Sequence, residues 1–171
     1  SFADQVPGRF LGPTAYDKPA LALRLLREVV VGPERFDPAF KEYFRRWAYK
    51  HPTPADFFRT IEDGVGEDLS WFWRSWLFTT AQLDQAVDSV GSGEGGVKIF
   101  LRNRGSMTLP LEMDVGFADG TTERIRLPVE MWNQGPRFAY RVRGGKPVRR
   151  VVVDPRRVLP DIDRSNNPFP R

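Results

Sequence analysis

The fold is decided by residues 68–90, DLSWFWRSWLFTTAQLDQAVDSV, because the spacing of the hydrophobic residues changes inside this stretch. Its first part repeats large apolar residues at the intervals of an amphipathic helix, namely Leu69, Phe72, Trp73, Trp76 and Leu77. From Leu83 to Val90 the pattern becomes that of a strand. We therefore expect a domain boundary near residue 82, with helices over residues 1–82 and strands over residues 83–171.

The part before this boundary predicts four short helices that pack as a helical bundle. Asp17 is expected to cap the first helix, with Pro19 in its first turn and Gly32-Pro33 at its end. The second helix is expected to begin at Asp37-Pro38 and the third at Thr53-Pro54. Asp56 follows Thr53 by three residues, which favours a capping box.

The part after the boundary predicts six or seven short strands and no helix. Apolar residues alternate with polar ones over residues 97–101, 111–117, 125–129 and 138–142, and residues 148–153 form a β-branched run. Asp119-Gly120 is typical of a hairpin turn. The prediction is a small antiparallel β-sandwich of the immunoglobulin-like kind, which makes the whole chain α+β. Residues 166–171 are polar and proline-rich, so we expect this tail to fray.

Charge and hydropathy exclude several classes of partner. The chain carries a formal net charge of +4, and the excess lies in residues 83–171, where most basic side chains alternate with apolar ones. This pattern indicates the solvated faces of a sheet, so no nucleic-acid partner is expected. There is no apolar stretch long enough for a membrane span. The first residues also lack the features of a signal peptide.

The residues do not provide a complete catalytic centre. With one histidine, His51, and no cysteine, a zinc site would have to consist almost entirely of carboxylates. Asp161 and Asp163 have a calcium-like spacing but no EF-hand loop, so a structural turn is the preferred interpretation. His51 is interpreted as a helix-end residue, and the acidic pair Glu62-Asp63 likewise. We expect the chain to bind no cofactor and to be catalytically inert alone.

The order of the motifs nevertheless resembles the aminopeptidase N-like family of zinc metallopeptidases, the gluzincins. In that family a tyrosine in the context Y-[ED]-K-G opens an apolar helix, and Tyr16-Asp17-Lys18 followed by residues 20–23 is similar to it. Aromatic helical segments follow here at residues 36–44, 54–58 and 68–77, as they do in the family. The closing residues 153–167 are similar to the end of the sandwich in several bacterial members. Pro19 departs from the pattern by replacing the usual glycine.

The resemblance implies that this chain is the C-terminal part of a zinc aminopeptidase, with residues 1–82 ending the catalytic domain. It implies zinc in the intact parent and a peptide as substrate, with the family's metal-binding residues before Ser1. Tyr16 would be the one catalytic residue here, donating a hydrogen bond to the oxyanion of the tetrahedral intermediate. A simpler interpretation is a packed aromatic residue at a helix start.

Two functions from different classes therefore remain open. The first is the peptidase fragment, whose partner is the upstream catalytic domain of the parent chain. The second is an independent, non-catalytic β-sandwich module that binds protein or carbohydrate. The peptidase interpretation also predicts an exposed apolar patch near Tyr16, through which the chain could self-associate. The sequence does not decide where the parent protein resides, and a periplasmic or secreted location is one interpretation.

Overall fold

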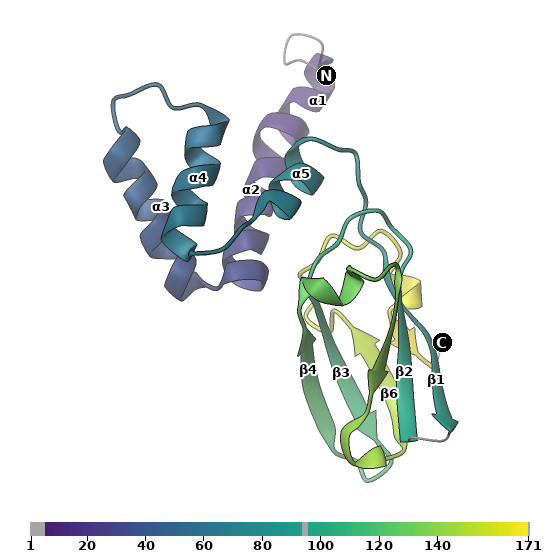
Figure 1. The fold of residues 1–171 in the computed structure, drawn as a ribbon. Helices are drawn as coiled ribbons and strands as arrows, with labels where there is room; N and C mark the ends of the chain where they lie inside the picture. The colour runs from purple at the N-terminus through teal and green to yellow at the C-terminus, as the bar shows by residue number, and fades with distance from the viewer. Residues whose placement is uncertain (1–5, 94–95, 171) are drawn as a thin grey trace. The chain divides into compact units, whose positions relative to one another are not determined.

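The computed structural model describes residues 6–93 and 96–170. The chain divides into two compact units, the first ending at Leu77 and the second beginning at Phe78 (Figure 1). The first unit is helical, and the second consists of two antiparallel sheets, which confirms the predicted α+β fold class. In the described part of the chain, no helix combines the length and the apolar character needed to cross a bilayer.

The first helix is longer than predicted and contains two π-helical segments. It runs without a break through α1 (Gly8–Gly12), η2 (Pro13–Asp17), α2 (Lys18–Leu25) and η3 (Leu26–Val31). The π-helical segments are η2 and η3. The expected cap at Asp17 was wrong, because this residue has helical dihedral angles and its side chain makes no capping hydrogen bond. The end of the helix was predicted correctly, since Gly32 leaves the helix with a φ of 93°.

Three further helices complete the first unit: α3 (Pro33–Trp47), α4 (Pro54–Val65) and α5 (Ser70–Leu77). The predicted start of α3 at Asp37 was wrong, since Gly32 and Pro33 provide the N-cap and the first helical position. Asp37 instead accepts two hydrogen bonds from the Arg27 guanidinium, at 2.7 and 2.9 Å. The capping box at Thr53 and Asp56 is confirmed, and α4 ends at Gly66 in the left-handed conformation.

The core of the helical unit is rich in aromatic side chains. Helices α3 and α4 lie side by side (Figure 1), and Phe40 meets Phe57 edge-on with ring centroids 6.3 Å apart. The Trp73 ring on α5 stacks on Phe58 at 4.8 Å. Every position of the predicted α5 stripe except Leu77 is buried. The hydrophobic spacing at residues 69–76 therefore identified a true core face.

The second unit is a two-layer sandwich whose described residues form seven strands (Figure 1). Three of them form a sheet in the order β1 (Gln85–Gly93), β2 (Gly96–Asn103) and β5 (Arg137–Arg141). The other sheet has the order β4 (Thr122–Leu127), β3 (Leu111–Phe117), β6 (Val148–Val153) and β7 (Pro168–Phe169). All strand pairs within the sheets are antiparallel.

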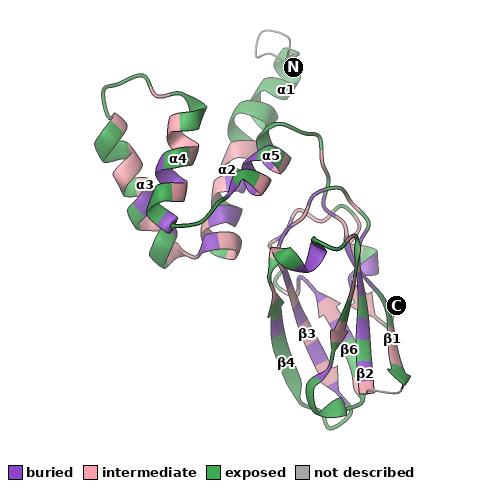
Figure 2. Ribbon diagram, viewed as in Figure 1, coloured by how far each residue is buried: buried purple, intermediate pink, exposed green. Residues whose placement is uncertain are grey.

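The two sheets enclose one hydrophobic core. Buried residues alternate with more exposed ones along β2 and β3, as the bands in Figure 2 show. Ile99 and Leu101 from one sheet join Met113, Val115 and Val151 from the other in this core. Trp132 covers part of the same core and donates a hydrogen bond from Nε1 to the Leu109 carbonyl at 3.1 Å.

The expectation of a frayed tail was wrong. Pro168 and Phe169 form β7 and pair with β6, and both Asn166 and Asn167 are buried. The Asn166 amide donates to Asp84 at 2.8 Å and to Asp163 at 3.0 Å. Asn167 accepts a hydrogen bond from the backbone N–H of Val153 at 3.0 Å. Specific polar contacts thus fix a segment whose composition alone suggested disorder.

Candidate functional site

Tyr16 lies in the π-helical segment η2, within the continuous first helix. The segment is defined by the backbone N–H of Lys18, which donates to the carbonyl of Pro13 five residues earlier. Segments of this kind are rare inside α-helices and occur frequently at functional sites, because they bulge the backbone and change the direction of a side chain. The residue that the sequence singled out therefore lies in an irregular stretch of an otherwise regular helix.

The two prolines around Tyr16 explain why the helix is irregular here. Pro19 has no N–H, so it cannot donate to the carbonyl of Ala15, and its ring crowds that carbonyl in a regular α-helix. Pro13 occupies the first position of η2 and likewise has no N–H. A wider turn between the two prolines relieves this crowding. Sequence reasoning missed the π-helical segment, although two prolines six positions apart in one helix were a signal for it.

The side chain of Tyr16 is open to solvent. It is 72% exposed, and the flanking residues Ala15 and Asp17 are exposed as well. The Tyr16 hydroxyl makes no hydrogen bond with any residue that the structure describes. Earlier in the same helix, Phe10 and Leu11 are 48% and 47% exposed. The phenol is therefore free to donate to a group outside this unit, and it is not a packed core aromatic.

The remaining sequence candidates do not join Tyr16 in a site. His51 is exposed and lies four residues beyond the end of α3, and it makes no hydrogen bond within residues 6–93 and 96–170. The interpretation of His51 as a capping residue was therefore wrong. Asp161 accepts hydrogen bonds from the backbone N–H groups of Gln85 and Asp163, at 3.1 and 3.0 Å. Asp163 accepts one from Ser165, so both carboxylates serve turns, as predicted.

The described residues do not fit a zinc ion. No three His, Cys, Asp or Glu side chains among them come together in a way that could hold a metal. A protein zinc site needs three or four such ligands in tetrahedral geometry.

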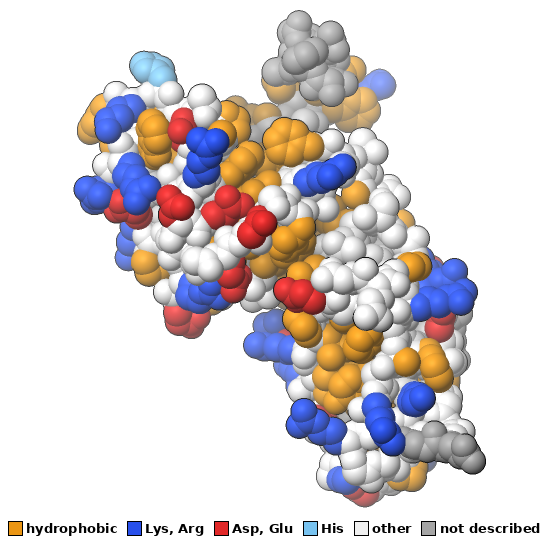
Figure 3. Space-filling view, in the orientation of Figure 1, with side chains coloured by type: hydrophobic (Ala, Val, Ile, Leu, Met, Phe, Trp, Pro, Cys, Tyr) orange, Lys and Arg blue, Asp and Glu red, His pale blue; other side chains and the backbone are white. Residues whose placement is uncertain are grey.

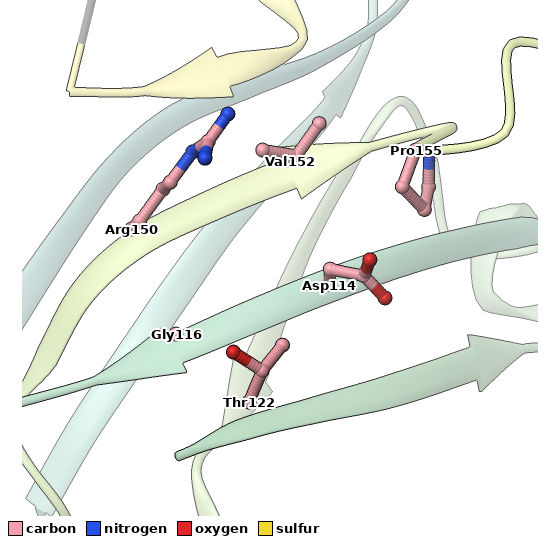
Figure 4. Close-up of a pocket in the computed structure, with 6 residues that line it drawn as sticks. All are labelled: Asp114, Gly116, Thr122, Arg150, Val152 and Pro155. Atoms are coloured by element: carbon pink, nitrogen blue, oxygen red, sulfur yellow. The ribbon is translucent and has the colours of Figure 1, made fainter. Parts of the chain in front are cut away.

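One shallow hollow of about 370 Å³ lies on the outer face of the four-stranded sheet (Figure 4). Its lining combines charged, polar and apolar residues from β3, β4 and β6 and from the turn after β6: Asp114, Gly116, Thr122, Arg150, Val152 and Pro155. The Asp114 carboxylate accepts two hydrogen bonds from Arg124, at 2.8 and 2.9 Å. These bonds hold the pKa of Asp114 below its ordinary value. An ionised, already paired carboxylate is a poor general base.

Comparison with known proteins connects the helical unit with peptidases. Residues 4–76 match the model of the peptidase family M1 domain, which confirms the resemblance predicted from the segment around Tyr16 and the aromatic helices. No curated protein matches the chain. Among solved structures, Legionella pneumophila aminopeptidase A in complex with aspartic acid is similar, with 19% identity and a TM-score of 0.49. The similarity covers 74% of this chain but only 15% of the length of that aminopeptidase.

Proposed function

We propose that this chain forms the C-terminal part of a zinc-dependent aminopeptidase-type metallopeptidase that hydrolyses peptide bonds. In this proposal residues 1–82 end the catalytic domain, and residues 83–171 form a separate sandwich domain. The observation that carries it is the position of Tyr16, exposed in a π-helical segment inside the region that matches the peptidase family. The zinc ligands would be supplied by an upstream domain of the same parent chain, since the described residues do not fit the metal.

Tyr16 has a defined role in this proposal. When a peptide bond is hydrolysed, the scissile carbonyl oxygen gains negative charge in the tetrahedral intermediate. A phenol O–H aimed at that oxygen stabilises the charge and thereby lowers the barrier. The Tyr16 hydroxyl suits this role because its side chain projects into solvent with no internal hydrogen bond among the described residues. Its position on a helix fixes the backbone from which the phenol reaches the substrate.

Substitution of the tyrosine in the intact parent enzyme tests the role. We expect Tyr16→Phe to lower kcat by roughly 10²–10³-fold, because it removes one donor to the oxyanion, and to leave the zinc content unchanged. Tyr49→Phe is the matched control, since Tyr49 is a fully exposed tyrosine of the same unit and should give the parental kcat. An unchanged kcat in the Tyr16 variant would rule out the oxyanion role.

The reading frame upstream of Ser1 separates the two functional classes. The peptidase proposal requires an H-E-x-x-H motif there, because this motif provides two zinc ligands and the general base in metallopeptidases. The alternative is a non-catalytic β-sandwich module that binds protein or carbohydrate. An upstream region without the motif would exclude the peptidase and leave this alternative. The isolated chain, supplied with zinc, should release no product from an aminoacyl chromogenic substrate.

A further inference from the structure

The outer face of the three-stranded sheet is unusually basic. Along β2 and β5 more exposed residues alternate with less exposed ones, which are buried on β2 and half-buried on β5, so one set of side chains from each strand points away from the core. We call this set the basic face: Lys98, Phe100 and Arg102 on β2 with Arg137, Ala139 and Arg141 on β5. The strand register places Lys98 opposite Arg141 and Arg102 opposite Arg137. Like charges thus face each other twice across one pair of strands.

This arrangement costs stability, because like charges directly opposite each other in an antiparallel pair repel. Asp88 gives partial compensation at one end, with its carboxylate 3.8 Å from Arg102 and 3.2 Å from Arg104. At the other end, Lys98 and Arg141 form no ion pair with any described residue. Among the described residues, this face has two unfavourable cross-strand pairs and little acidic compensation. Such a face is suited to a partner that supplies negative charge.

On the outer face of the other sheet, the neighbouring strands β3 and β4 arrange their charges differently. There Asp114 stands opposite Arg124 and Glu112 opposite Arg126, and the ion-pair distances are 2.8 and 2.7 Å. Arg156 adds a second contact to Glu112 at 2.9 Å. Opposite charges are therefore paired across β3 and β4, whereas cations are set against cations across β2 and β5. The contrast within one small unit argues against a merely solvated basic face.

Phe100 gives the basic face an apolar centre. The ring is 40% exposed, and its cross-strand neighbours Ser89 and Ala139 are both small. Gly91 lies beside the ring, since a Cβ atom placed there would be 3.5 Å from Phe100 Cε2. The aromatic ring thus stands above small neighbours, with the cations toward both ends of the strands. Figure 3 shows Lys and Arg side chains next to hydrophobic ones on the surface of the sandwich unit.

We propose that the basic face binds the surface of an anionic phospholipid bilayer. The cations would contact lipid phosphates and carboxylates, and Phe100 would enter the headgroup region. The two cation pairs lie about 13 Å apart along the strands, four residues at roughly 3.3 Å each, so the face is broad and matches a surface. Single-stranded nucleic acid is usually bound in a groove with several stacking aromatics, whereas this face offers one. The proposal does not depend on the peptidase function.

Vesicle sedimentation of the full chain tests the proposal. Vesicles of equal parts phosphatidylserine and phosphatidylcholine should bind the chain at low salt and release it at high salt, and pure phosphatidylcholine vesicles should not bind it. Each cation near an anionic surface contributes about a fivefold effect. We therefore expect Lys98→Ala/Arg141→Ala to weaken binding roughly 30-fold. Phe100→Ala should weaken it as well, by a factor that changes little with salt.

The matched control removes the same charge from the other sheet. Arg149 and Arg150 on β6 are exposed and form no ion pair with the described residues. Because the proposed membrane contact lies on the other sheet, Arg149→Ala/Arg150→Ala should leave binding within about twofold of the parent chain. If the two double variants lose vesicle binding equally, the loss follows net charge alone, and the proposal is overturned. Binding to heparin or a single-stranded oligonucleotide without binding to vesicles would also overturn it.

Thermal unfolding separates a binding defect from misfolding. Because Lys98→Ala/Arg141→Ala removes a repulsive pair, the variant should unfold at the same temperature as the parent chain or higher. Weaker vesicle binding by a variant of undiminished stability would support the basic face as the contact surface. A lower unfolding temperature would contradict the repulsion on which the proposal rests.

Discussion

Gly64 on α4 and Ala39 on α3 lie so close that a Cβ atom added to Gly64 would stand 2.5 Å from Cβ and 2.9 Å from Cα of Ala39. Both distances are far below van der Waals contact, and one of them involves backbone. The missing side chain of Gly64 therefore allows the two helices to approach each other, and Ala39 is itself buried at this contact. The position of α4 against α3 depends on a residue whose presence within a helix would otherwise be unfavourable.

The first prediction is that Gly64→Ala destabilises the helical unit by about 1–3 kcal/mol, because the added methyl group forces the two helices apart. Helix propensity alone would give the opposite sign, a gain of up to about 1 kcal/mol. Urea denaturation followed by tryptophan fluorescence measures the effect, since Trp47, Trp71, Trp73 and Trp76 all lie in this unit.

Gly12→Ala is the control for this prediction. Gly12 is helical, with φ −54°, and a Cβ atom there would meet nothing within 4 Å. This variant should be as stable as the parent chain or more so. A loss at Gly12 equal to that at Gly64 would show that contact between the helices is not the cause.

The second prediction concerns Gly105, where the chain approaches another backbone segment. A Cβ atom at Gly105 would lie 2.1 Å from the Gln82 carbonyl oxygen and 2.9 Å from the Asp84 backbone nitrogen. The Gln82 carbonyl accepts hydrogen bonds from the N–H groups of Ser106 and Met107, both at 3.0 Å. Gly105→Ala should therefore disrupt these bonds and cost at least about 2 kcal/mol.

Gly116→Ala is the matched variant in the same unit, and thermal unfolding followed by circular dichroism compares the two. At Gly116 the nearest atom to an added Cβ would be 3.6 Å away, an ordinary contact. We expect this variant to unfold within a few degrees of the parent chain, well above Gly105→Ala. If both variants unfold at the same temperature, the close approach at Gly105 has no energetic importance.

The third prediction concerns Glu62, which connects α4 with α5. Its Oε1 accepts hydrogen bonds from the backbone N–H of Leu69 at 3.0 Å and from Trp73 Nε1 at 3.1 Å. Both donors belong to buried residues. Glu62→Ala leaves the two N–H groups unpaired and should cost about 1–3 kcal/mol. Glu62→Gln keeps an acceptor oxygen and should cost less.

Asp63→Ala is the control for Glu62, since the Asp63 side chain is 70% exposed and lies 3.8 Å from Arg46. An exposed ion pair of this kind contributes little, so urea denaturation should find less than about 1 kcal/mol of change. Equal effects of Glu62→Ala and Glu62→Gln would show that the acceptor oxygen is unimportant. A large effect at Asp63 would indicate a contribution that the hydrogen bonds do not explain.

Hydrophobic spacing predicted the helices and strands well, because the buried positions of a helix or a strand recur at a regular spacing along the sequence. In and just before α5, Leu69, Phe72, Trp73 and Trp76 are buried as expected, and so are the alternating residues of β3. Polar residues were harder to predict, because a polar side chain is fixed by its partner and the partner is distant in sequence. Glu62 was assigned to a helix end but binds α5. Asn166 was assigned to a frayed tail but binds Asp84.

The candidate site, too, was predicted from the sequence only in part. Tyr16 was found through its resemblance to a family motif, not through hydrophobic spacing, since residues 13–17 are all exposed and give no periodic signal. The π-helical segment around it depends on which carbonyl each N–H reaches, and no spacing of residue types specifies that choice. The register that opposes Lys98 to Arg141 was equally hidden, because a β5 strand next to β2 is a crossover that the sequence does not determine.

The fourth prediction concerns the pH response of α3. Hydrogen bonds from Arg45 and then Arg46 lower the pKa of Glu42 from 4.5 to about 2, with the closest contacts at 2.6 and 2.7 Å. Because the folded pKa is lower than that of the unfolded chain, this interaction stabilises the native state above about pH 4.5. The contribution is lost as the pH falls through about 2. Arg45→Gln/Arg46→Gln should raise the pKa of Glu42 toward 4.5, as carboxyl NMR titration would show. Lys41→Gln is the control, because Lys41 lies on the same helix but contributes to the pKa of Asp37 and not to that of Glu42. A Glu42 pKa that moves as much in the Lys41 variant as in the double variant would exclude the two arginine hydrogen bonds as the cause.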